Sequence, residues 1–530
     1  MHTHKKTLPG LIVALALLIC SCSAGGNKRD TPERGAARAS EAPVDTAAGW
    51  SVAQENKLPG TTDWRLAKQG PVGSIEGFTD HVSVTSGESF ELFVSTTAPS
   101  FVVRAYRIGW YGGKQGRLLW ESETIAGRKQ AAAERVPEIN LVSAPWDPSL
   151  TVPTKGWPEG NYLMKLTSAK GFEQWVPMTV RSTNTAGRAV FINAATTWAA
   201  YNTWGGYNVY GGPNGTGKDK TGKEKTDYAN RSRKAGFDRP YDKVGAPGTW
   251  YEQPVLVTAE RMGAPLAYAT DIELHADPDL FKGATALFFP GHDEYWSAAM
   301  MHNVTAMRDN GTNIAFLASN TAYRHVRMEP SALGADRVVT VYKDPSEDPM
   351  LATNPDDATQ QWRQPPNPRP ESALTGILYE GNPVQAAYVV TEPDVWFFAG
   401  TGAKKGDKYP GLVGVEWDRL TRDVPVPRPI QVVSESPLLK GGKTPTVAHT
   451  SYYTTPSGSG VFSSGTMQWS CSVNNDQCAK RLAPKSVAFA RKVTENLFTE
   501  FSKGPVGKVH PARDNYEQYA KPLSNSDYSL

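Results

Sequence analysis

The fold of this chain of 530 residues is decided by residues 284–320, "ATALFFPGHDEYWSAAMMHNVTAMRDNGTNIAFLASN". Residues 284–291 form a nearly continuous apolar run, as expected for a strand that is buried on both faces. Residues 297–311 then suit a helix, with Ser297 as its N-cap and Gly311 at its end. Residues 312–320 form the next strand. The order strand, helix, strand predicts parallel strands joined by a helical crossover.

The same alternation continues on both sides of this segment. Further strands are predicted at residues 188–194 and 265–271, and helices at residues 249–263 and 486–501. From about residue 342 to residue 468 the pattern is strand-like again. We therefore predict an α/β domain over residues 185–505, with a mainly parallel sheet and additional strands.

The segment before this domain has a different pattern. Residues 75–182 contain short runs of alternating polar and apolar residues, separated by turn residues and without sustained helical periodicity. This pattern is typical of a β-sandwich, and we expect an immunoglobulin-like one. The predicted fold class is thus mixed, with an N-terminal β-sandwich followed by the α/β domain.

The N-terminus has the features of an export signal. Residues 1–22 combine a short basic start with an apolar run that is too short to cross a membrane comfortably. The residues Ile19 to Cys22 resemble a bacterial lipobox, which predicts lipidation of Cys22 and a cell-surface lipoprotein anchored to the membrane by lipid. Cleavage near Ala24 would instead give a secreted protein. Residues 23–74 suit a flexible tether, and residues 506–530 a tail.

Charge and cysteine content narrow the possible partners. The 56 basic and 53 acidic residues nearly balance, so the composition gives no indication of nucleic-acid binding. In an exported protein, Cys471 and Cys478 are expected to form a disulfide. A zinc site is not expected there, because the nearby sequence has no histidine or further cysteine.

Residues 193–212, "NAATTWAAYNTWGGYNVYGG", directly follow a predicted strand and space large rings three residues apart. The rings could pack in a corner of the fold, stack on a sugar, or include a phenol with a chemical role. These possibilities stay open at this point. The rings belong to Trp198, Tyr201, Trp204, Tyr207 and Tyr210.

Two more polar clusters follow predicted strands. His292, Asp293 and Glu294 come after the strand at 284–291, and Asn320 stands at the end of the strand at 312–320. A loop of this kind is more commonly a solvated turn. Because ligands bind outside the carboxyl ends of parallel strands, however, three polar loops at one sheet edge would form a site. Standard motifs for a nucleophilic serine, a zinc protease or a phosphate loop are not found in the sequence.

Several stretches, in this order, resemble the large (beta) subunit of N,N-dimethylformamidase and single-chain bacterial proteins that share its C-terminal domain. The resemblance covers most of residues 76–505, and "GHDEYWS" followed by "SNTAY" is its most specific part. The stretches are "YRIGWYGG", "GHDEYWS", "LASNTAYRHVR", "WRQPP", "LVGVEWD" and "GVFSSGTMQW".

This resemblance implies a mononuclear ferric ion, Fe3+, held by two tyrosines and one glutamate. The glutamate would be Glu294, and the first tyrosine Tyr201. The second would be Tyr241 in "GFDRPYDK", with Tyr228 as a nearby rival. The resemblance further implies catalytic roles for three residues, which are His292, Asn320 and Glu416.

The implied chemistry is cleavage of an amide-type C–N bond in a small molecule. Phenolate and carboxylate oxygens suit a hard trivalent ion, which can polarise a carbonyl and activate water. His292 would move protons, and Asn320 would hold the substrate oxygen. Trp198, Trp204 and Tyr207 are expected to shape the pocket around Tyr201.

Other interpretations remain. The resembled enzyme works with a small subunit, so a partner subunit or an oligomer is possible. The chain could instead be a non-catalytic surface protein that binds glycans through its rings. A metal-free hydrolase using the carboxylates of Asp293 and Glu294 is the third possibility, but adjacent residues on one loop rarely face the same target.

Overall fold

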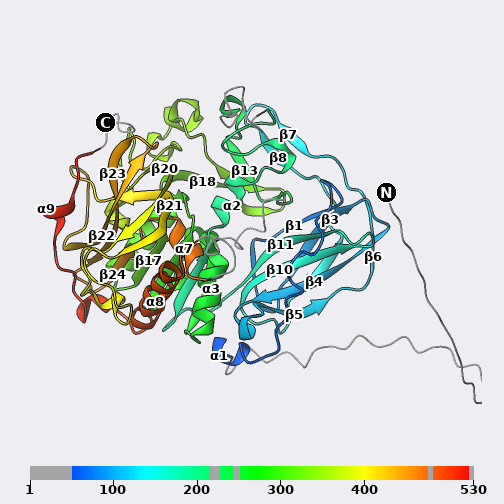
Figure 1. Ribbon diagram of the computed structural model, residues 1–530. Coiled ribbons are helices and arrows are strands. Elements are labelled where there is room, and N and C mark those ends of the chain that lie inside the picture. The colour runs from blue at the N-terminus through cyan, green and yellow to red at the C-terminus, as the bar shows by residue number, and fades with distance from the viewer. Residues whose placement is uncertain (1–49, 215–226, 243–250, 475–481, 524–530) are drawn as a thin grey trace, which may run out of the picture. The chain divides into compact units, whose positions relative to one another are not determined.

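The computed structural model of the protein describes residues 50–214, 227–242, 251–474 and 482–523 (Figure 1). Within these residues the fold is mixed α/β, with most of the regular structure in strands that form several sheets. None of the helices in the described part is long and apolar enough to cross a membrane. The predicted signal segment and Cys22 lie outside the described residues.

The largest sheet has seven strands in the order β14-β12-β15-β17-β24-β23-β22. The pairs from β14 to β24 are parallel, and the last two pairs are antiparallel. The prediction from residues 284–320 is therefore confirmed, since β15 and β17 are parallel neighbours. The bounds are β14 (Leu266–Thr270), β12 (Ala189–Asn193), β15 (Ala286–Gly291), β17 (Asn313–Ala318), β24 (Gly460–Ser463), β23 (Thr444–Thr454) and β22 (Ile430–Lys440).

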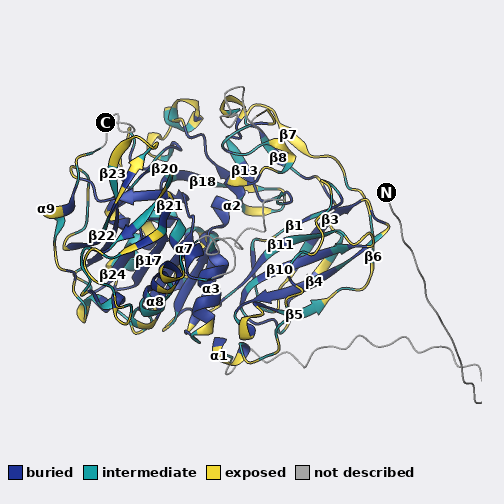
Figure 2. Ribbon diagram, viewed as in Figure 1, coloured by how far each residue is buried: buried dark blue, intermediate teal, exposed yellow. Residues whose placement is uncertain are grey.

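The longer helices cover this sheet. They are α3 (Glu252–Arg261), α5 (Ala298–Asp309) and α8 (Pro484–Phe501), close to the positions predicted from the sequence. The Ser297 side chain accepts a hydrogen bond from the Met300 amide and so caps α5 as expected. Phe498 of α8 stacks on Phe288 of β15, with the ring centroids 3.7 Å apart. In Figure 1, α3 and α8 lie side by side in front of the sheet, whose strands are largely buried in Figure 2.

Two smaller sheets complete the α/β part of the chain. One has the order β13-β19-β18-β16, and the other pairs β20 with β21. Their bounds are β13 (Lys234–Gly236), β16 (Tyr295–Ser297), β18 (Arg324–Ser331), β19 (Gly334–Thr340), β20 (Leu378–Val389) and β21 (Lys408–Arg419).

The N-terminal segment forms separate antiparallel-rich sheets, so the prediction that residues 75–182 consist of strands is confirmed. One sheet has the order β1-β3-β9, and another β2-β11-β10-β4-β5, with β6 paired to β4; β7 pairs with β8. Its classification as an immunoglobulin-like sandwich, like the proposed domain boundaries, stays a prediction. The bounds are β1 (Ile75–Thr79), β2 (Ser83–Thr85), β3 (Ser89–Thr96), β4 (Ser100–Ile108), β5 (Gly116–Glu121), β6 (Ile125–Ala126), β7 (Glu134–Val136), β8 (Leu141–Ser143), β9 (Leu150–Pro153), β10 (Gly160–Ser168) and β11 (Glu173–Arg181).

A buried ion pair joins these strands to α3. The Arg107 guanidinium of β4 lies 2.7 Å from the Glu260 carboxylate, and both side chains are fully buried. The hydroxyl of Tyr268 also donates to Glu260, at 2.7 Å. Since buried charges need paired, hydrogen-bonded partners, this contact fixes how β4 packs on α3.

The remaining α-helices are short, and the last of them belongs to the segment that we predicted to be a tail. Residues 506–523 instead pack on the body of the fold, because Tyr519 is only 5% exposed and Lys521 pairs with Glu435 of β22 at 2.7 Å. Residues 524–530 lie outside the described residues. The short helices are α1 (Val52–Glu55), α2 (Ala195–Tyr201), α4 (Asp271–Ala276), α6 (Ser372–Thr375), α7 (Gln468–Ser472) and α9 (Tyr516–Tyr519).

Candidate functional site

Three side-chain oxygens meet beyond the carboxyl ends of β12 and β15. The hydroxyl groups of Tyr201 and Tyr210 each donate to Oε2 of Glu294, both at 2.8 Å. The two phenolic oxygens lie 2.6 Å apart, and Tyr295 donates to the Tyr210 oxygen at 2.7 Å. Glu294 is 2% exposed, whereas Tyr201 taken as a whole residue is 39% exposed.

The backbone around Glu294 is held on both sides. Gly291 ends β15 with a φ of 88°, and a Cβ at this position would lie 2.6 Å from Cβ of Tyr251. Only glycine fits this approach to the start of α3. The Glu294 amide then donates to Thr197 Oγ1 at 3.0 Å, and its carbonyl accepts from the Arg324 amide at 2.8 Å.

Tyr201 is the last residue of α2, which starts directly after β12. The amides of Ala195 and Thr196 donate to the carboxylate of Asp271, at 3.1 and 3.0 Å. Asp271 therefore satisfies the free amides at the helix N-terminus and fixes the direction of the helix. The Thr196 hydroxyl also donates to the Tyr295 carbonyl at 2.8 Å, which ties α2 to the loop that carries Glu294.

Tyr210 reaches Tyr201 because Asn208 folds the chain back. The Asn208 side-chain oxygen accepts from the amides of Tyr210 and Gly211, at 2.9 and 3.0 Å. Its side-chain amide donates to the Tyr201 carbonyl at 3.2 Å. Asparagine commonly forms such turns through its own side chain. Tyr210 belongs to the ring-rich stretch of the sequence, but the spacing of the rings did not identify it as the partner of Tyr201.

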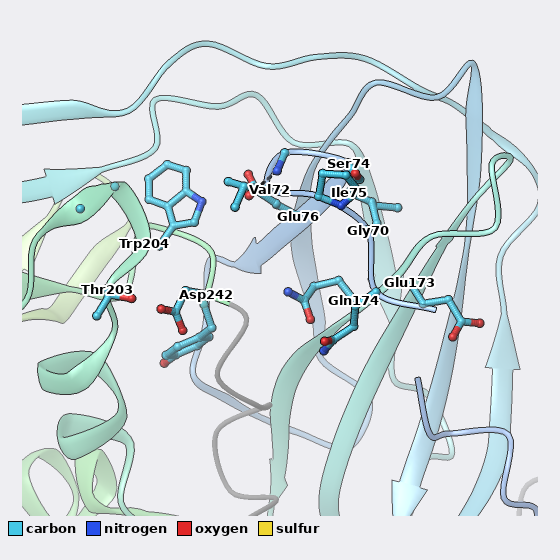
Figure 3. Close-up of a pocket in the computed structure, with 16 residues that line it drawn as sticks. Gly70, Val72, Ser74, Ile75, Glu76, Glu173, Gln174, Thr203, Trp204 and Asp242 are labelled. Atoms are coloured by element: carbon cyan, nitrogen blue, oxygen red, sulfur yellow. Dashed lines mark hydrogen bonds between the residues drawn. The ribbon is translucent and has the colours of Figure 1, made fainter. Parts of the chain in front are cut away.

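The sequence analysis placed Tyr241 in this cluster as the second tyrosine, but in the structure Tyr241 lies elsewhere. Tyr241 lines a cavity of about 520 Å³ with Trp204 and Asp242, and burial raises the pKa of its hydroxyl, partly offset by the charges of Arg337 and Arg239. Figure 3 shows Trp204 and Asp242 on one side of this cavity.

The segment that carries Tyr241 has another role. Arg239, which is 1% exposed, donates to the carbonyls of Trp204 and Tyr207, each at 3.0 Å, and to that of Asn202 at 3.1 Å. It therefore satisfies the carbonyls at the end of α2 and holds the loop behind Tyr201. The rival candidate Tyr228 is 45% exposed and lies under the Arg231 guanidinium.

The three aromatic side chains expected around Tyr201 contact other residues instead. Trp198 donates to Glu252 at 2.8 Å, and Trp204 packs edge-on against Trp146 at 5.8 Å. Tyr207 lies under the Arg135 guanidinium. The expectation that these three rings surround Tyr201 is therefore wrong, because each is used in a different packing contact. The rings around Tyr201 belong to Tyr210, His292 and Tyr295.

The predicted residues His292, Asn320 and Glu416 do come together. Nε2 of His292 lies 3.3 Å from Glu416 Oε2, 3.3 Å from Asn320 Nδ2 and 3.6 Å from Glu294 Oε2. Burial disfavours a charged imidazole, but the carboxylates of Glu416 and Glu294 outweigh it and raise the pKa of His292 to about 9. His292 Nε2 thus lies between the carboxylates of Glu416 and Glu294.

Asn320 sits in a strained loop after β17. Its φ is 57° and that of Ala322 is 52°, in the left-handed region that non-glycine residues rarely occupy. The Asn320 amide donates to Asp418 Oδ1 at 3.0 Å, and the Ala322 amide donates to the Asp293 carbonyl at 2.9 Å. Strain of this kind persists only where surrounding contacts fix the loop, and it is common at functional sites.

Two buried basic side chains face the cluster, and the sequence analysis gave neither of them a role. Lys343 Nζ lies 3.2 Å from the ring centroid of Tyr210, and Arg324 Nε lies 3.6 Å from Glu294 Oε1. Burial alone would raise the pKa of Glu294, but Lys343, His292 and Arg324 lower it. Arg324 is the first residue of β18, and Lys343 follows the end of β19 by three residues.

Adjacent Asp293 faces a different direction from Glu294. Its Oδ1 accepts from the buried Trp296 indole at 2.8 Å, whereas Glu294 faces the phenols. The two carboxylates therefore do not address one target, as a metal-free hydrolase using this pair would need. Cys471 is buried, and Cys478 lies outside the described residues, so their disulfide stays a prediction.

In the described part of the chain, no group of three or more histidine, cysteine, aspartate or glutamate side chains is arranged to hold a metal. The cluster around Glu294 is of another type, because two of its three oxygens are phenolic. Hard anionic oxygens of this kind are ligands for hard, highly charged cations.

Comparisons with known proteins identify the family of this chain. A family described as "N,N-dimethylformamidase beta subunit-like, C-terminal" matches residues 102–480. No curated protein matches the chain. One solved structure, a cycloisomaltooligosaccharide glucanotransferase of Paenibacillus sp. with bound cycloisomaltoheptaose, is 11% identical, with 37% of this chain and 27% of that enzyme covered and a TM-score of 0.14. The chain thus spans about a quarter of that enzyme, and a match at this TM-score supports no argument about fold or function.

Proposed function

The chain belongs to the N,N-dimethylformamidase beta subunit-like family, and from this premise we propose that it is a hydrolase that cleaves an amide-type C–N bond in a small molecule. The observation that carries the proposal is the meeting of Tyr201, Tyr210 and Glu294 beside His292, Asn320 and Glu416. The first three offer a ligand set, and the other three offer groups that bind and protonate a substrate.

We further propose that the phenols and the carboxylate hold one ferric ion, with Tyr210 in the place that the sequence had given to Tyr241. The three oxygens are 2.6–2.8 Å apart. Oxygens that share one small cation at bond lengths of about 2.0 Å and right angles are separated by roughly 2.8 Å. If both phenols donate to Glu294, no proton remains between the two phenolic oxygens. These residues therefore fit the ion.

The tyrosines keep their protons until such an ion binds. Burial and the charge of Glu294 raise the pKa values of the Tyr201 and Tyr210 hydroxyl groups well above their usual range. A bound cation inverts this preference and displaces the protons, so metal binding should release protons. When bound, the ion would polarise the substrate carbonyl and activate water.

The neighbouring side chains suit the remaining steps of amide cleavage. The Asn320 amide is placed to donate to the substrate carbonyl oxygen as negative charge develops there. Protonated His292 can give its Nε2 proton to the leaving nitrogen, which must be protonated before the C–N bond breaks. Glu416, at 3.3 Å, stabilises the imidazolium and keeps the ring in position.

We also propose that the protein is exported from the cytoplasm. Residues 1–22 suggest export with a lipid on Cys22, or secretion after cleavage near Ala24. An exported amidase would act on small amides outside the cytoplasm. A partner subunit or oligomer, as in the resembled enzyme, is a further possibility.

Glycan binding has less support as a second function. The side chains of Trp198 and Trp204 contact Glu252 and Trp146, so neither forms an open platform beside Tyr201.

The proposal is tested with the purified chain lacking the predicted signal segment. Iron content and the visible spectrum are measured first. Release of dimethylamine from N,N-dimethylformamide and of amines from other small amides is then followed. We expect near-stoichiometric iron, a phenolate charge-transfer band and amide hydrolysis. A colourless protein that takes up no iron and cleaves no amide would contradict the proposal.

A further inference from the structure

Glu416 lies opposite a bulge in the neighbouring strand. The register of β20 on β21 shifts around Gly381 and resumes at Val384. Between these two positions β20 has two residues, Asn382 and Pro383, whereas β21 has only Glu416. Two residues facing one is the arrangement of a β-bulge, which bends the strand and redirects side chains, often beside active sites.

The bulge brings the Asn382 side chain to Glu416. Nδ2 of Asn382 donates to Glu416 Oε1 at 3.0 Å and to the Tyr379 hydroxyl at 2.9 Å. The other carboxylate oxygen, Oε2, lies 3.3 Å from His292 Nε2. The two oxygens of one carboxylate thus have separate partners, one from the bulge and one in the site.

We propose that Asn382 is a positioning residue, which holds Oε1 of Glu416 so that Oε2 faces His292. This inference rests on the proposed function, in which Glu416 keeps the His292 ring in position. In the described part of the chain, Asn382 is the hydrogen-bond donor found for Oε1. A glutamate side chain has several rotatable bonds, so one hydrogen bond at its end decides where the carboxylate is directed.

Asn382 itself contributes little to the core. It is exposed, whereas Glu416 is 6% exposed. Its amide group is therefore not needed to fill space, and its contacts are with Glu416 and Tyr379 at the rim of the site. A role in directing Glu416 explains these contacts better than a role in packing does.

Tyr379 connects the bulge to the loop that carries Asn320. Its ring packs edge-on against Tyr323, with centroids 5.0 Å apart, and Tyr323 follows Asn320 by three residues. Burial and the charges of Glu416 and Glu294 raise the pKa of Tyr379, as expected for a hydroxyl close to both carboxylates. The bulge, Glu416 and the Asn320 loop therefore form one connected wall of the site.

The test uses Asn382→Ala and Asn382→Asp, with Gln385→Ala as the matched control. Gln385 is exposed on the same strand. Asn382→Asp keeps the size of the side chain but replaces the donor by a negative charge. Each variant is crystallised, and kcat and KM are measured with N,N-dimethylformamide or whichever small amide the wild type cleaves.

We expect the carboxylate of Glu416 to leave its 3.3 Å contact with His292 in both Asn382 variants. The value of kcat should fall by about 10- to 100-fold with little change in KM, as is typical when a supporting hydrogen bond is lost. Iron content and melting temperature should match the wild type. Gln385→Ala should be unchanged in every measurement.

The outcomes separate this inference from the proposed function. A wild type that cleaves no amide would defeat the proposed function, while a displaced Glu416 in the variants would still support positioning by Asn382. An active wild type, with Glu416 in place and kcat unchanged in the variants, would overturn the inference. If Asn382→Ala does not fold, the same two measurements on the isosteric Asn382→Asp decide it.

Discussion

The phenolic oxygen of Tyr210 lies 2.6 Å from that of Tyr201, and both hydroxyl groups donate to the same oxygen of Glu294. Two residues nine positions apart thus present their oxygens to one carboxylate. This relationship distinguishes Tyr210 from Tyr241 and Tyr228, which the sequence analysis offered as the second ligand. It leads to the first prediction.

Tyr201→Phe and Tyr210→Phe are each expected to weaken the visible charge-transfer band and to lower the iron content, because each removes a phenolate ligand. Tyr241→Phe is the control, since Tyr241 lines a separate cavity. The measurements are the absorption spectrum and metal analysis of the purified variants. Loss of the band in Tyr241→Phe, with the band retained in Tyr210→Phe, would show that Tyr241 is the second ligand.

The second prediction concerns stability. Arg107→Met should lower the free energy of unfolding by about 3–5 kcal/mol, because it leaves the buried carboxylate of Glu260 without its partner. Arg104→Met, which removes a partly exposed pair with Glu121, should cost at most about 1 kcal/mol. The side chains of the first pair are both 0% exposed, and those of the second are 32% and 44% exposed.

Unfolding in urea, followed by fluorescence and circular dichroism, measures both changes. Equal effects of the two substitutions would show that the Arg107 pair does not join β4 to α3 in the way described.

The third prediction concerns acid stability near the C-terminus. His449 Nδ1 accepts from the Leu420 amide at 3.0 Å, so in the neutral ring the proton is on Nε2, which faces Glu435 at 3.2 Å. The hydrogen bond from His449 and the one from Lys521 outweigh burial and lower the pKa of Glu435 to about 2. The unfolded chain has the ordinary value of about 4.3.

Because the folded-state pKa is lowered, Glu435 stabilises the fold fully above its unfolded pKa, and this contribution is lost as pH falls towards about 2. The stability difference between wild type and Glu435→Gln should therefore be largest near neutral pH and shrink between about pH 5 and pH 2. Chemical unfolding across this range measures it. A difference that does not change with pH would contradict the lowered pKa.

The fourth prediction uses the backbone of Asn320. Its φ of 57° is tolerated by asparagine and glycine but costs other residues about 1–2 kcal/mol. Asn320→Gly should therefore fold with nearly wild-type stability while losing amide hydrolysis. Asn320→Val should lose amide hydrolysis and also be less stable by about 1–2 kcal/mol. Calorimetry and the amide assay on the two variants separate the backbone role from the role of the side chain, and equal melting temperatures would argue against strain at this position.

Much of the fold could be predicted because its signals are local. The apolar run at β15, the cap at Ser297 and the run at β17 each follow from neighbouring residues, and together they required parallel strands. The meeting of His292, Glu294 and Asn320 also followed, since parallel strands end at one edge of a sheet.

The rest of the site depends on contacts between distant segments. Arg324, Lys343 and Asn382 come from strands and loops that only the folded chain places beside Glu294 and Glu416. Lys343 and Asn382 lie in stretches without a turn, cap or periodicity that points to a ligand, and Arg324 follows the Asn320 loop without itself being singled out.

The sequence by itself determined the alternating strands and helices and the order of the polar loops, because hydrophobic periodicity and helix caps act over a few residues. Only the tertiary structure decided that Tyr210, and not Tyr241, meets Tyr201. The Asn208 side chain turns Tyr210 inwards. Arg239, in the segment that carries Tyr241, instead binds the carbonyls of residues that follow α2. Which of two tyrosines reaches a carboxylate depends on side-chain hydrogen bonds across the fold, and these are not encoded in spacing along the chain.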